Sequence, residues 1–207
     1  GVPNGVENSM FQLGKLILLS MVATFGTASI AANAVGNAIS MVAVLTGMAM
    51  NLGVVPVISR CIGAGDYQQA GFYTHKLMKW TYAAMFAGNL LVMLALPLLL
   101  KIYGLSQGTA DLAFQIITIN CVCAVFIWPI SFTLPNILRA TGDVTYTMIV
   151  SVASMWIFRI FCAFFLGKIL GMGLIGIWIA MIIDWIVRSI CFIARYKKGK
   201  WKRAAIV

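Results

Sequence analysis

The chain has 207 residues, of which 62% are hydrophobic and 10% charged, and its formal net charge is +10. Soluble domains are roughly 45–50% apolar and about 25% charged, so an ordinary water-soluble domain is excluded. Disordered and disulfide-scaffold classes are excluded as well, because the chain is apolar and its five cysteines include no Cys-x-x-Cys pair. The composition indicates an integral membrane protein.

Stretches without charge predict the membrane-spanning helices, since one crossing needs roughly 20 mostly apolar residues. Residues 16–59 carry no charge and are long enough for two crossings once the segment before Lys15 is included. We predict an all-α transmembrane lobe over residues 1–195, followed by a basic tail over 196–207. Its six helices are expected at about 6–26, 30–57, 78–100, 111–137, 145–167 and 173–195.

The distribution of basic residues predicts how the lobe is oriented. Six crossings place both ends on one side, and ten Lys and Arg residues fall on that side, against Lys101 and Lys168 on the other. Cytoplasmic loops carry the excess of positive charge, so we expect a multi-pass protein of the cell (plasma or inner) membrane with both ends cytoplasmic. Six basic residues lie in the last thirteen positions. We interpret them as contacts to anionic lipid of the bilayer rather than to nucleic acid.

A short motif occurs twice, 79 residues apart, at matching cytoplasmic exits. The sequence Pro-x-Ile-x-Arg ends at Arg60 and again at Arg139, and each copy is followed closely by Gly-Asp. Glycine lets a helix end, and Asp66 with Gln69 three residues later can form a capping box. The simplest interpretation is a pair of good helix–turn–helix connections, although the repetition also suggests the internal symmetry of transporters. The turn residues are Gly63, Gly65, Asp66, Gly142 and Asp143.

Five segments, in order along the chain, carry a family resemblance. They are Pro3-Asn4-Gly5-Val6-Glu7, Gly63-Ala64-Gly65-Asp66, Leu138-Arg139-Ala140-Thr141-Gly142-Asp143, Met155-Trp156-Ile157-Phe158-Arg159 and Trp178-Ile179-Ala180-Met181-Ile182-Ile183-Asp184-Trp185. Together they resemble the second half of the multidrug and toxic compound extrusion (MATE) transporters. The resemblance covers essentially the whole chain.

This resemblance implies a twelve-helix fold of two six-helix lobes around a central cavity with alternating access. It implies an antiporter that exports organic, often cationic, drugs and toxic compounds in exchange for H⁺ or Na⁺, with no other cofactor. The chain would supply the second lobe. It begins with Gly1 rather than Met, so we expect the N-terminal six-helix lobe to be a missing partner.

The same resemblance implies that Glu7 takes part in cation binding. A charge inside a span costs roughly 2.5–3.5 kcal/mol, which independently makes Glu7 a functional candidate, and Asn8 gives it polar company. The alternative is that Glu7 forms a structural ion pair. Lys15, eight residues later on the helix, can be its partner only if one of the two side chains bends toward the other. The fourth helix has no carboxylate after Asp111, which fits proton coupling at least as well as sodium coupling.

Three further charges lie inside the last two predicted spans. Asp184 and Arg188 are four residues apart on one helix face and can pair, and Arg159 could meet Asp184 at a similar depth. We interpret the three as a neutralised cluster that fixes two helices together, because a buried charge persists chiefly when it is paired.

Isolated polar residues within the spans either line a cavity or form hydrogen bonds between helices, and the second role is the commoner one. Asn120 is grouped with Glu7 and Asn8 as a candidate cation-coupling or substrate residue. The others are Asn33, Asn37, Asn89 and Ser131. Twelve Met and twelve Phe residues would suit a cavity for varied apolar cations, although most are expected to serve packing.

Two alternatives to a drug antiporter stay open at this point. A lipid-linked oligosaccharide flippase of the same superfamily would be expected to show more cationic cavity residues than Arg159 and Lys15. A non-transporting structural membrane subunit would tolerate loss of Glu7. An enzyme and a metal site are not expected, because the spans contain no His and His75 lies in a cytoplasmic connection.

Overall fold

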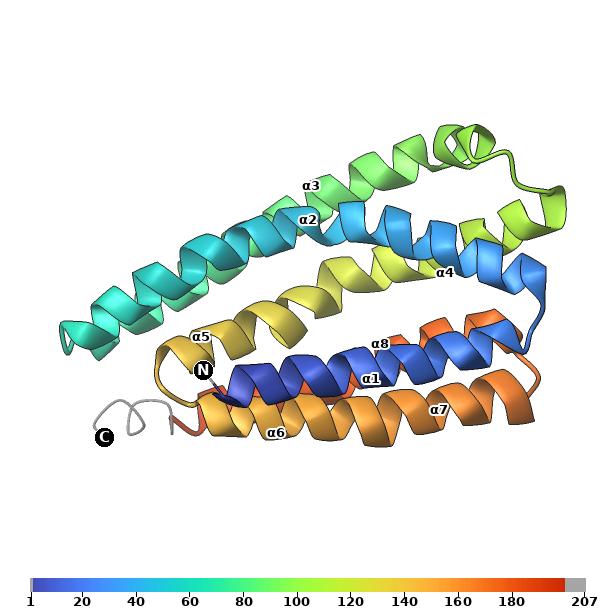
Figure 1. Cartoon of the computed structure of the whole chain (residues 1–207). Helices are drawn as coiled ribbons and strands as arrows, with labels where there is room; N and C mark the ends of the chain where they lie inside the picture. The colour runs from blue at the N-terminus through green and yellow to red at the C-terminus, as the bar shows by residue number, and fades with distance from the viewer. Residues whose placement is uncertain (1, 200–207) are drawn as a thin grey trace.

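The computed structural model describes residues 2–199, which are almost entirely helical (Figure 1). Three π-helical segments continue their neighbouring α-helices, so the described chain forms six long rods, as predicted. The α-helices are α1 (Val2–Ala23), α2 (Thr27–Gly63), α3 (Tyr67–Ile102), α4 (Gln107–Trp128), α5 (Leu134–Ala140), α6 (Val144–Ser154), α7 (Phe161–Phe164) and α8 (Gly173–Lys197). The π-helical segments are η1 (Pro129–Thr133), η2 (Met155–Ile160) and η3 (Phe165–Ile169).

The helices extend further than the apolar stretches that predicted them. Helix α2 continues to Gly63 rather than 57, and α3 begins at Tyr67 rather than 78. Hydropathy measures the part of a helix that fits the hydrocarbon, whereas the helix itself continues until its backbone is interrupted. Here the interruption is Gly65, whose φ of 73° is open to glycine at little cost. Residues 200–207 of the predicted tail lie outside the described residues.

Five of the rods are long and apolar enough to cross a membrane. Helix α1 is not among them, because Glu7, Asn8 and Lys15 lie between its apolar residues. The rods alternate in direction, so the N-terminal end of α1, the turn before α3, the turn before α6 and the end of α8 share one end of the molecule (Figure 1).

The rods form two groups with a seam between them. Helices α2, α3 and α4 pack against one another, and the rod containing α6 and α7 packs against α8 and α1 (Figure 1). Contacts between α4 and α8 join the groups, and the largest hydrophobic cluster lies there, with Ile39, Ile116, Ile117 and Trp178 among its members.

Small residues let the rods approach closely. A Cβ atom on Gly176 of α8 would stand 2.7 Å from the backbone carbonyl carbon of Leu166, and one on Gly47 of α2 would meet the ring of Trp128. Helices in membranes associate through such close contacts, because the surrounding lipid is as apolar as their side chains.

The two repeated turns have the same backbone structure. In the first turn the backbone N–H of Gly65 donates to the carbonyl of Ile62, and that of Asp66 donates to the carbonyl of Cys61. In the second turn the N–H of Gly142 donates to the carbonyl of Arg139, and that of Asp143 donates to the carbonyl of Leu138. This is the Schellman arrangement, in which the glycine adopts a positive φ to satisfy the last carbonyls of a helix. The repeated motif therefore specifies how the chain leaves α2 and α5.

The aspartates of the two turns make different interactions. Asp66 accepts a 2.8 Å bond from the backbone N–H of Gln69, as the capping-box expectation required. The Gln69 side chain instead accepts from Cys61 Sγ, so only half of the expected box forms. Asp143 makes no such cap and pairs with Arg195.

Candidate functional site

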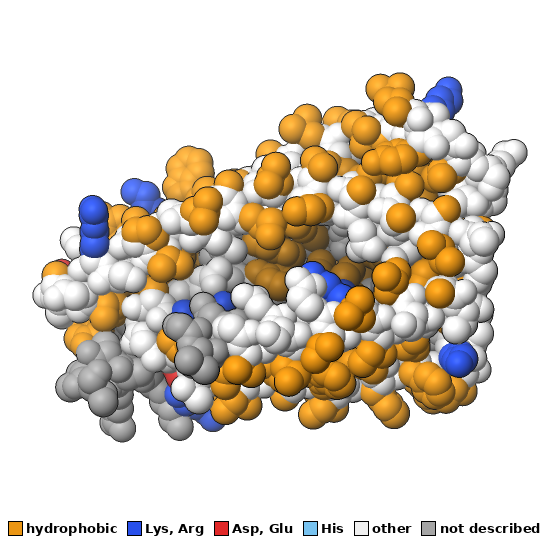
Figure 2. Space-filling view, viewed as in Figure 1, with side chains coloured by type: hydrophobic (Ala, Val, Ile, Leu, Met, Phe, Trp, Pro, Cys, Tyr) orange, Lys and Arg blue, Asp and Glu red, His pale blue; other side chains and the backbone are white. Residues whose placement is uncertain are grey.

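A pocket of about 520 Å³ opens on one face of the molecule, where α1 and α2 diverge. Figure 2 shows it as a hollow with hydrophobic walls and with basic side chains at its rim. Helices α4 and α8 and segment η2 complete its lining. The lining residues are Lys15, Leu18, Leu19, Val22, Asn33, Asn37, Ser40, Met41, Val44, Met48, Asn120, Trp128, Arg159, Ile177, Trp178, Met181 and Trp185.

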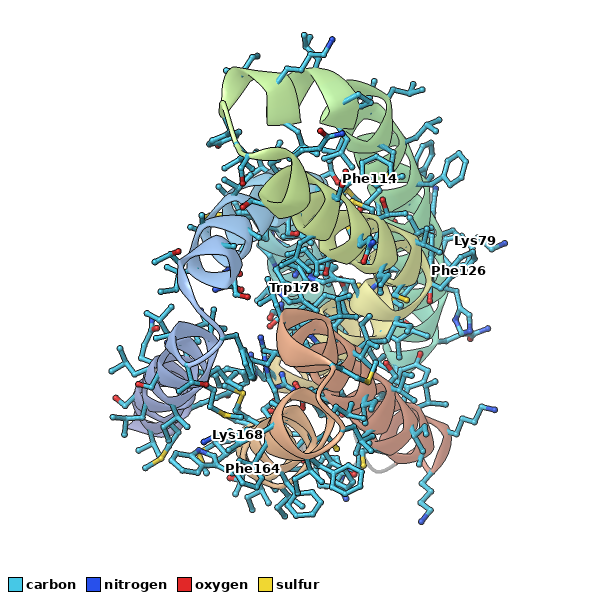
Figure 3. All side chains as sticks on the ribbon, turned by 90° about the vertical axis from the view of Figure 1, so that its right-hand side faces the viewer. Lys79, Phe114, Phe126, Phe164, Lys168 and Trp178 are labelled. Atoms are coloured by element: carbon cyan, nitrogen blue, oxygen red, sulfur yellow. The ribbon has the colours of Figure 1, made fainter. Side chains whose placement is uncertain are left out.

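Three tryptophans are among the apolar residues that line the pocket. Trp128, Trp178 and Trp185 come from α4 and α8, and Figure 3 places Trp178 in the interior between the two helix groups. The indole N–H of Trp178 donates to Asn33 Oδ1 at 3.2 Å, which fixes the ring against α2. Tryptophan faces and flexible methionines form surfaces that accept varied apolar molecules.

The polar part of the pocket consists of two cations and several uncharged groups. Lys15 reaches it from α1 and Arg159 from η2. Asn120 is buried in the pocket wall, and neither its amide nitrogen nor its amide oxygen has a hydrogen-bond partner. Of the two roles predicted for the isolated polar residues, Asn120 thus takes the cavity role.

Asn89 and Ser131 take the other role and bond between helices. Asn89 Nδ2 donates to the carbonyl of Ala43 at 3.3 Å, which links α3 to α2. Ser131 donates to the carbonyl of Trp185, which links η1 to α8.

Glu7 lies outside the pocket, in an ion pair with Arg139. Nη2 of Arg139 donates to its two carboxylate oxygens at 2.6 and 2.7 Å. The same guanidinium donates from Nη1 to Asn136 and from Nε to Thr147. The pair joins α1 to the end of α5. The partner is therefore Arg139 rather than Lys15. Sequence reasoning had placed this arginine in the repeated turn motif, whose position beside the first helix only the fold reveals.

Asn8 does not share the environment of Glu7. Its side chain is exposed and does not line the pocket, whereas Glu7 is 8% exposed. Adjacent residues on a helix point about 100° apart, so neighbours in sequence need not face the same group.

Asp184 and Arg188 form the expected buried pair. Arg188 Nε stands 3.2 Å from Asp184 Oδ1 and donates to Ser154 Oγ at 2.8 Å. The guanidinium also lies over the ring of Phe11, 4.6 Å from its centre. These contacts tie α8 to α6 and α1, which fits the structural role assigned to the pair.

Arg159 departs from the three-residue cluster that the sequence suggested. No hydrogen bond joins it to Asp184 in the described structure, and its buried Nε has no partner. It lies in the π-helical segment η2, whose wider turn changes the direction of its side chains, and such segments are frequent at functional sites. Arg159 lines the pocket instead, so its function separates from that of Asp184 and Arg188.

A third ion pair, between Asp143 and Arg195, is not predicted by the sequence. Arg195 donates to both oxygens of Asp143 at 2.6 and 2.9 Å, and its guanidinium lies over the ring of Tyr146. The pair ties the end of α8 to the turn before α6. Arg195 had been counted with the basic tail, and nothing in its sequence context distinguishes it from the neighbouring basic residues.

These pairs account for the acidic residues of the chain. Glu7, Asp143 and Asp184 are paired with arginines, Asp66 caps a helix and Asp111 is exposed on α4. With five acidic residues in the sequence, none is left to line the pocket, whose fixed charges are therefore positive.

Residues 3–165 match the model of the MatE family. The chain is 24% identical, over its whole length, to the probable multidrug resistance protein NorM of Thermotoga maritima. It is 26% identical, over 97% of its length, to the uncharacterized transporter YisQ of Bacillus subtilis. In each case it spans 44% of the relative's length.

Solved structures share the fold. One is a MOP superfamily transporter from Pyrococcus furiosus, described as having a binding pocket of reverse polarity that suggests a different function, and it superposes with a TM-score of 0.82. Another is a MATE protein in complex with MaL6, with a TM-score of 0.81. Each is 21% identical, and the match covers 92% of this chain and 42% of the other.

Proposed function

This chain belongs to the MatE family, that of the multidrug and toxic compound extrusion transporters, and on that premise we propose that it forms the second lobe of a cation-coupled efflux antiporter. The lobe lies in the cell membrane with both ends cytoplasmic. Its partner is a first lobe of similar size, since the chain spans only 44% of the relatives' length. The two lobes enclose the transported molecule.

The observation that carries this proposal is the open pocket between α1 and α2. It is a concave site with tryptophan and methionine walls and a few polar groups, which is the usual character of a small-molecule site. A second lobe facing it would close the hollow into a cavity at mid-depth of the molecule. Rocking of the lobes against each other then exposes the cavity to one side at a time.

The Glu7–Arg139 pair supports a role for Glu7 in coupling. A proton that binds the carboxylate removes its charge and weakens the bonds that hold α1 to α5. Because α1 forms one wall of the pocket, its release changes the pocket's shape. Proton binding at one place is thereby linked to substrate binding at another. We favour H⁺ over Na⁺, because a sodium ion would have to compete with the guanidinium for the same oxygens.

Glu7→Gln tests this proposal in the complete protein, reconstituted in vesicles. We expect substrate-driven movement of H⁺ or Na⁺ to fall to the level of empty vesicles, because the amide cannot exchange a proton. Binding of a fluorescent substrate should stay detectable, since Glu7 does not line the pocket, although the release of α1 changes its affinity. Asp111→Asn, at an exposed carboxylate, is the matched control. Unchanged exchange in Glu7→Gln removes Glu7 from the mechanism, whereas absence of exchange in the parent protein itself would favour a structural subunit.

The nature of the pocket also bears on the substrate. Its aromatic faces and methionines suit an apolar organic body, as the expectation of organic cations supposed. Its fixed charges, Lys15 and Arg159, would repel a simple organic cation.

A further inference from the structure

We propose that the pocket binds organic anions: molecules with an apolar body and a carboxylate, sulfonate or phosphate group. The apolar body lies on the tryptophans, and the anionic group is held by Lys15 and Arg159. This inference rests on the proposed function, because it takes the pocket to be the transport site. It reverses the charge of the substrate class that family resemblance alone implied.

The first argument is the charge of the lining. Lys15 and Arg159 line the pocket from two neighbouring rods, Lys15 from α1 and Arg159 from η2. The acidic residues of the chain are all accounted for elsewhere. Asp184 lies near enough to Arg159 to influence it electrostatically, but it is fully buried, does not line the pocket and is held by Arg188. A ligand's anionic group would therefore meet two cations without a competing carboxylate in the pocket wall.

The second argument is a set of hydrogen-bond donors without acceptors. Four lining residues have buried polar atoms with no partner in the described structure: Ser40 Oγ, Asn120 Nδ2 and Oδ1, Arg159 Nε and Trp185 Nε1. All of these atoms except the amide oxygen of Asn120 can donate a hydrogen bond. Such groups are rare in folded proteins because leaving a buried polar group unsatisfied is unfavourable. The oxygens of a carboxylate, sulfonate or phosphate only accept hydrogen bonds, so they match this set.

An organic cation finds no equivalent compensation in this lobe. It would give up its hydration on entering the pocket and would face two like charges, with aromatic faces and the amide oxygen of Asn120 in return. The tryptophans serve an organic anion equally well, because they contact its apolar body rather than its charge. Inorganic anions, which have no such body, would gain nothing from these walls.

Three fluorescent probes with one apolar body separate the contribution of charge. Pyrenesulfonate, pyrenemethanol and pyrenemethylammonium differ in the group attached to the ring. Each is titrated into the complete purified protein in detergent, and binding is read from pyrene anisotropy. We expect pyrenesulfonate to bind about tenfold or more tightly than pyrenemethylammonium, with pyrenemethanol between them, because hydrogen bonds to charged groups are stronger than those between neutral groups.

Lys15→Gln and Arg159→Gln locate the binding site. Each should weaken pyrenesulfonate binding about tenfold or more and leave pyrenemethanol binding within about twofold, because only the charged head contacts these residues. Lys15 is exposed, so its substitution leaves the fold intact even if Arg159→Gln does not. Lys168→Gln is the matched control: this lysine lies over Phe164 on the outer surface, away from the pocket, and its loss should change nothing (Figure 3).

The outcomes distinguish this inference from the proposed function. Tighter binding of pyrenemethylammonium, or equal loss of pyrenesulfonate binding in Lys168→Gln and Lys15→Gln, overturns the anion site. Uptake of the three probes into vesicles is then measured separately. Uptake of pyrenemethylammonium but not pyrenesulfonate would keep the transporter and reject the anion site, whereas anion binding without uptake of any probe would keep the site and reject transport.

Discussion

Single charged residues divide this lobe into structural and functional parts. Asp184 and Arg188 are both almost fully buried and face each other, and their contacts reach three other rods. The sequence groups Arg159 with this pair, but in the structure Arg159 lines the pocket. The difference lies in partners: a charge with its neutralising partner stabilises the fold, whereas a charge with no direct partner in a cavity is available to a ligand.

Asp184→Ala should lower the amount of protein in the membrane and its unfolding temperature in detergent. Removing the carboxylate leaves Arg188 buried without its counter-charge, and breaking a buried pair costs about 3–5 kcal/mol. Membrane abundance measured by immunoblot and a thermal unfolding scan check this. Asp111→Ala, at an exposed acid on α4, should behave as the parent protein. Normal abundance combined with lost transport would instead assign Asp184 to the transport mechanism.

At the scale of elements, glycines and turns set how the rods meet. The turns at Gly65 and Gly142 end α2 and α5 in the same way, which the repeated motif foretold. The close approach of α8 to the preceding rod at Gly176 had no such signal, because a glycine at a helix contact and a glycine facing lipid look alike in sequence. Gly53 of α2, for comparison, is exposed and meets no neighbouring rod.

Gly176→Ala should destabilise the lobe by about 1–3 kcal/mol, since the new methyl group would overlap the backbone around Leu166 and force the rods apart. The midpoint of thermal unfolding in detergent measures this. Gly53→Ala is the control: a Cβ there meets no atom within 4 Å, so alanine should be neutral or stabilise the helix by up to about 1 kcal/mol. Equal effects of the two substitutions would mean that the contact at Gly176 contributes nothing.

At the scale of the whole molecule, the six rods alternate in direction, so alternate connections lie at opposite ends (Figure 1). The end that holds the Glu7–Arg139 and Asp143–Arg195 pairs also holds Arg60, Lys197 and Lys198, at the ends of α2 and α8. Cytoplasmic loops carry such an excess, so this end is expected to face the cytoplasm. The coupling site proposed at Glu7 would then be reached from inside the cell.

Two cysteine substitutions test this orientation. Gln68 and Gln107 are exposed at the starts of α3 and α4, at opposite ends of the molecule. With a membrane-impermeant maleimide, we expect Gln107→Cys to be labelled in intact cells and Gln68→Cys only after the membrane is permeabilised. The parent protein gives the background from its five native cysteines. The reverse pattern would invert the orientation and place Glu7 on the outer side.

The sequence by itself determined the membrane class, the six rods, the backbone of the repeated turns and the family, because each depends on composition or on residues close together in the chain. Helix ends beyond the hydrocarbon were predicted less well, since hydropathy does not measure where a helix stops. The site depended on the tertiary structure. Lys15 and Arg159 are 144 positions apart in the sequence, and Arg139 and Glu7 are 132 positions apart. A local sequence pattern does not relate residues at such separations. Only the packing of α1 against the other rods decides which of these charges is neutralised and which opens onto the pocket.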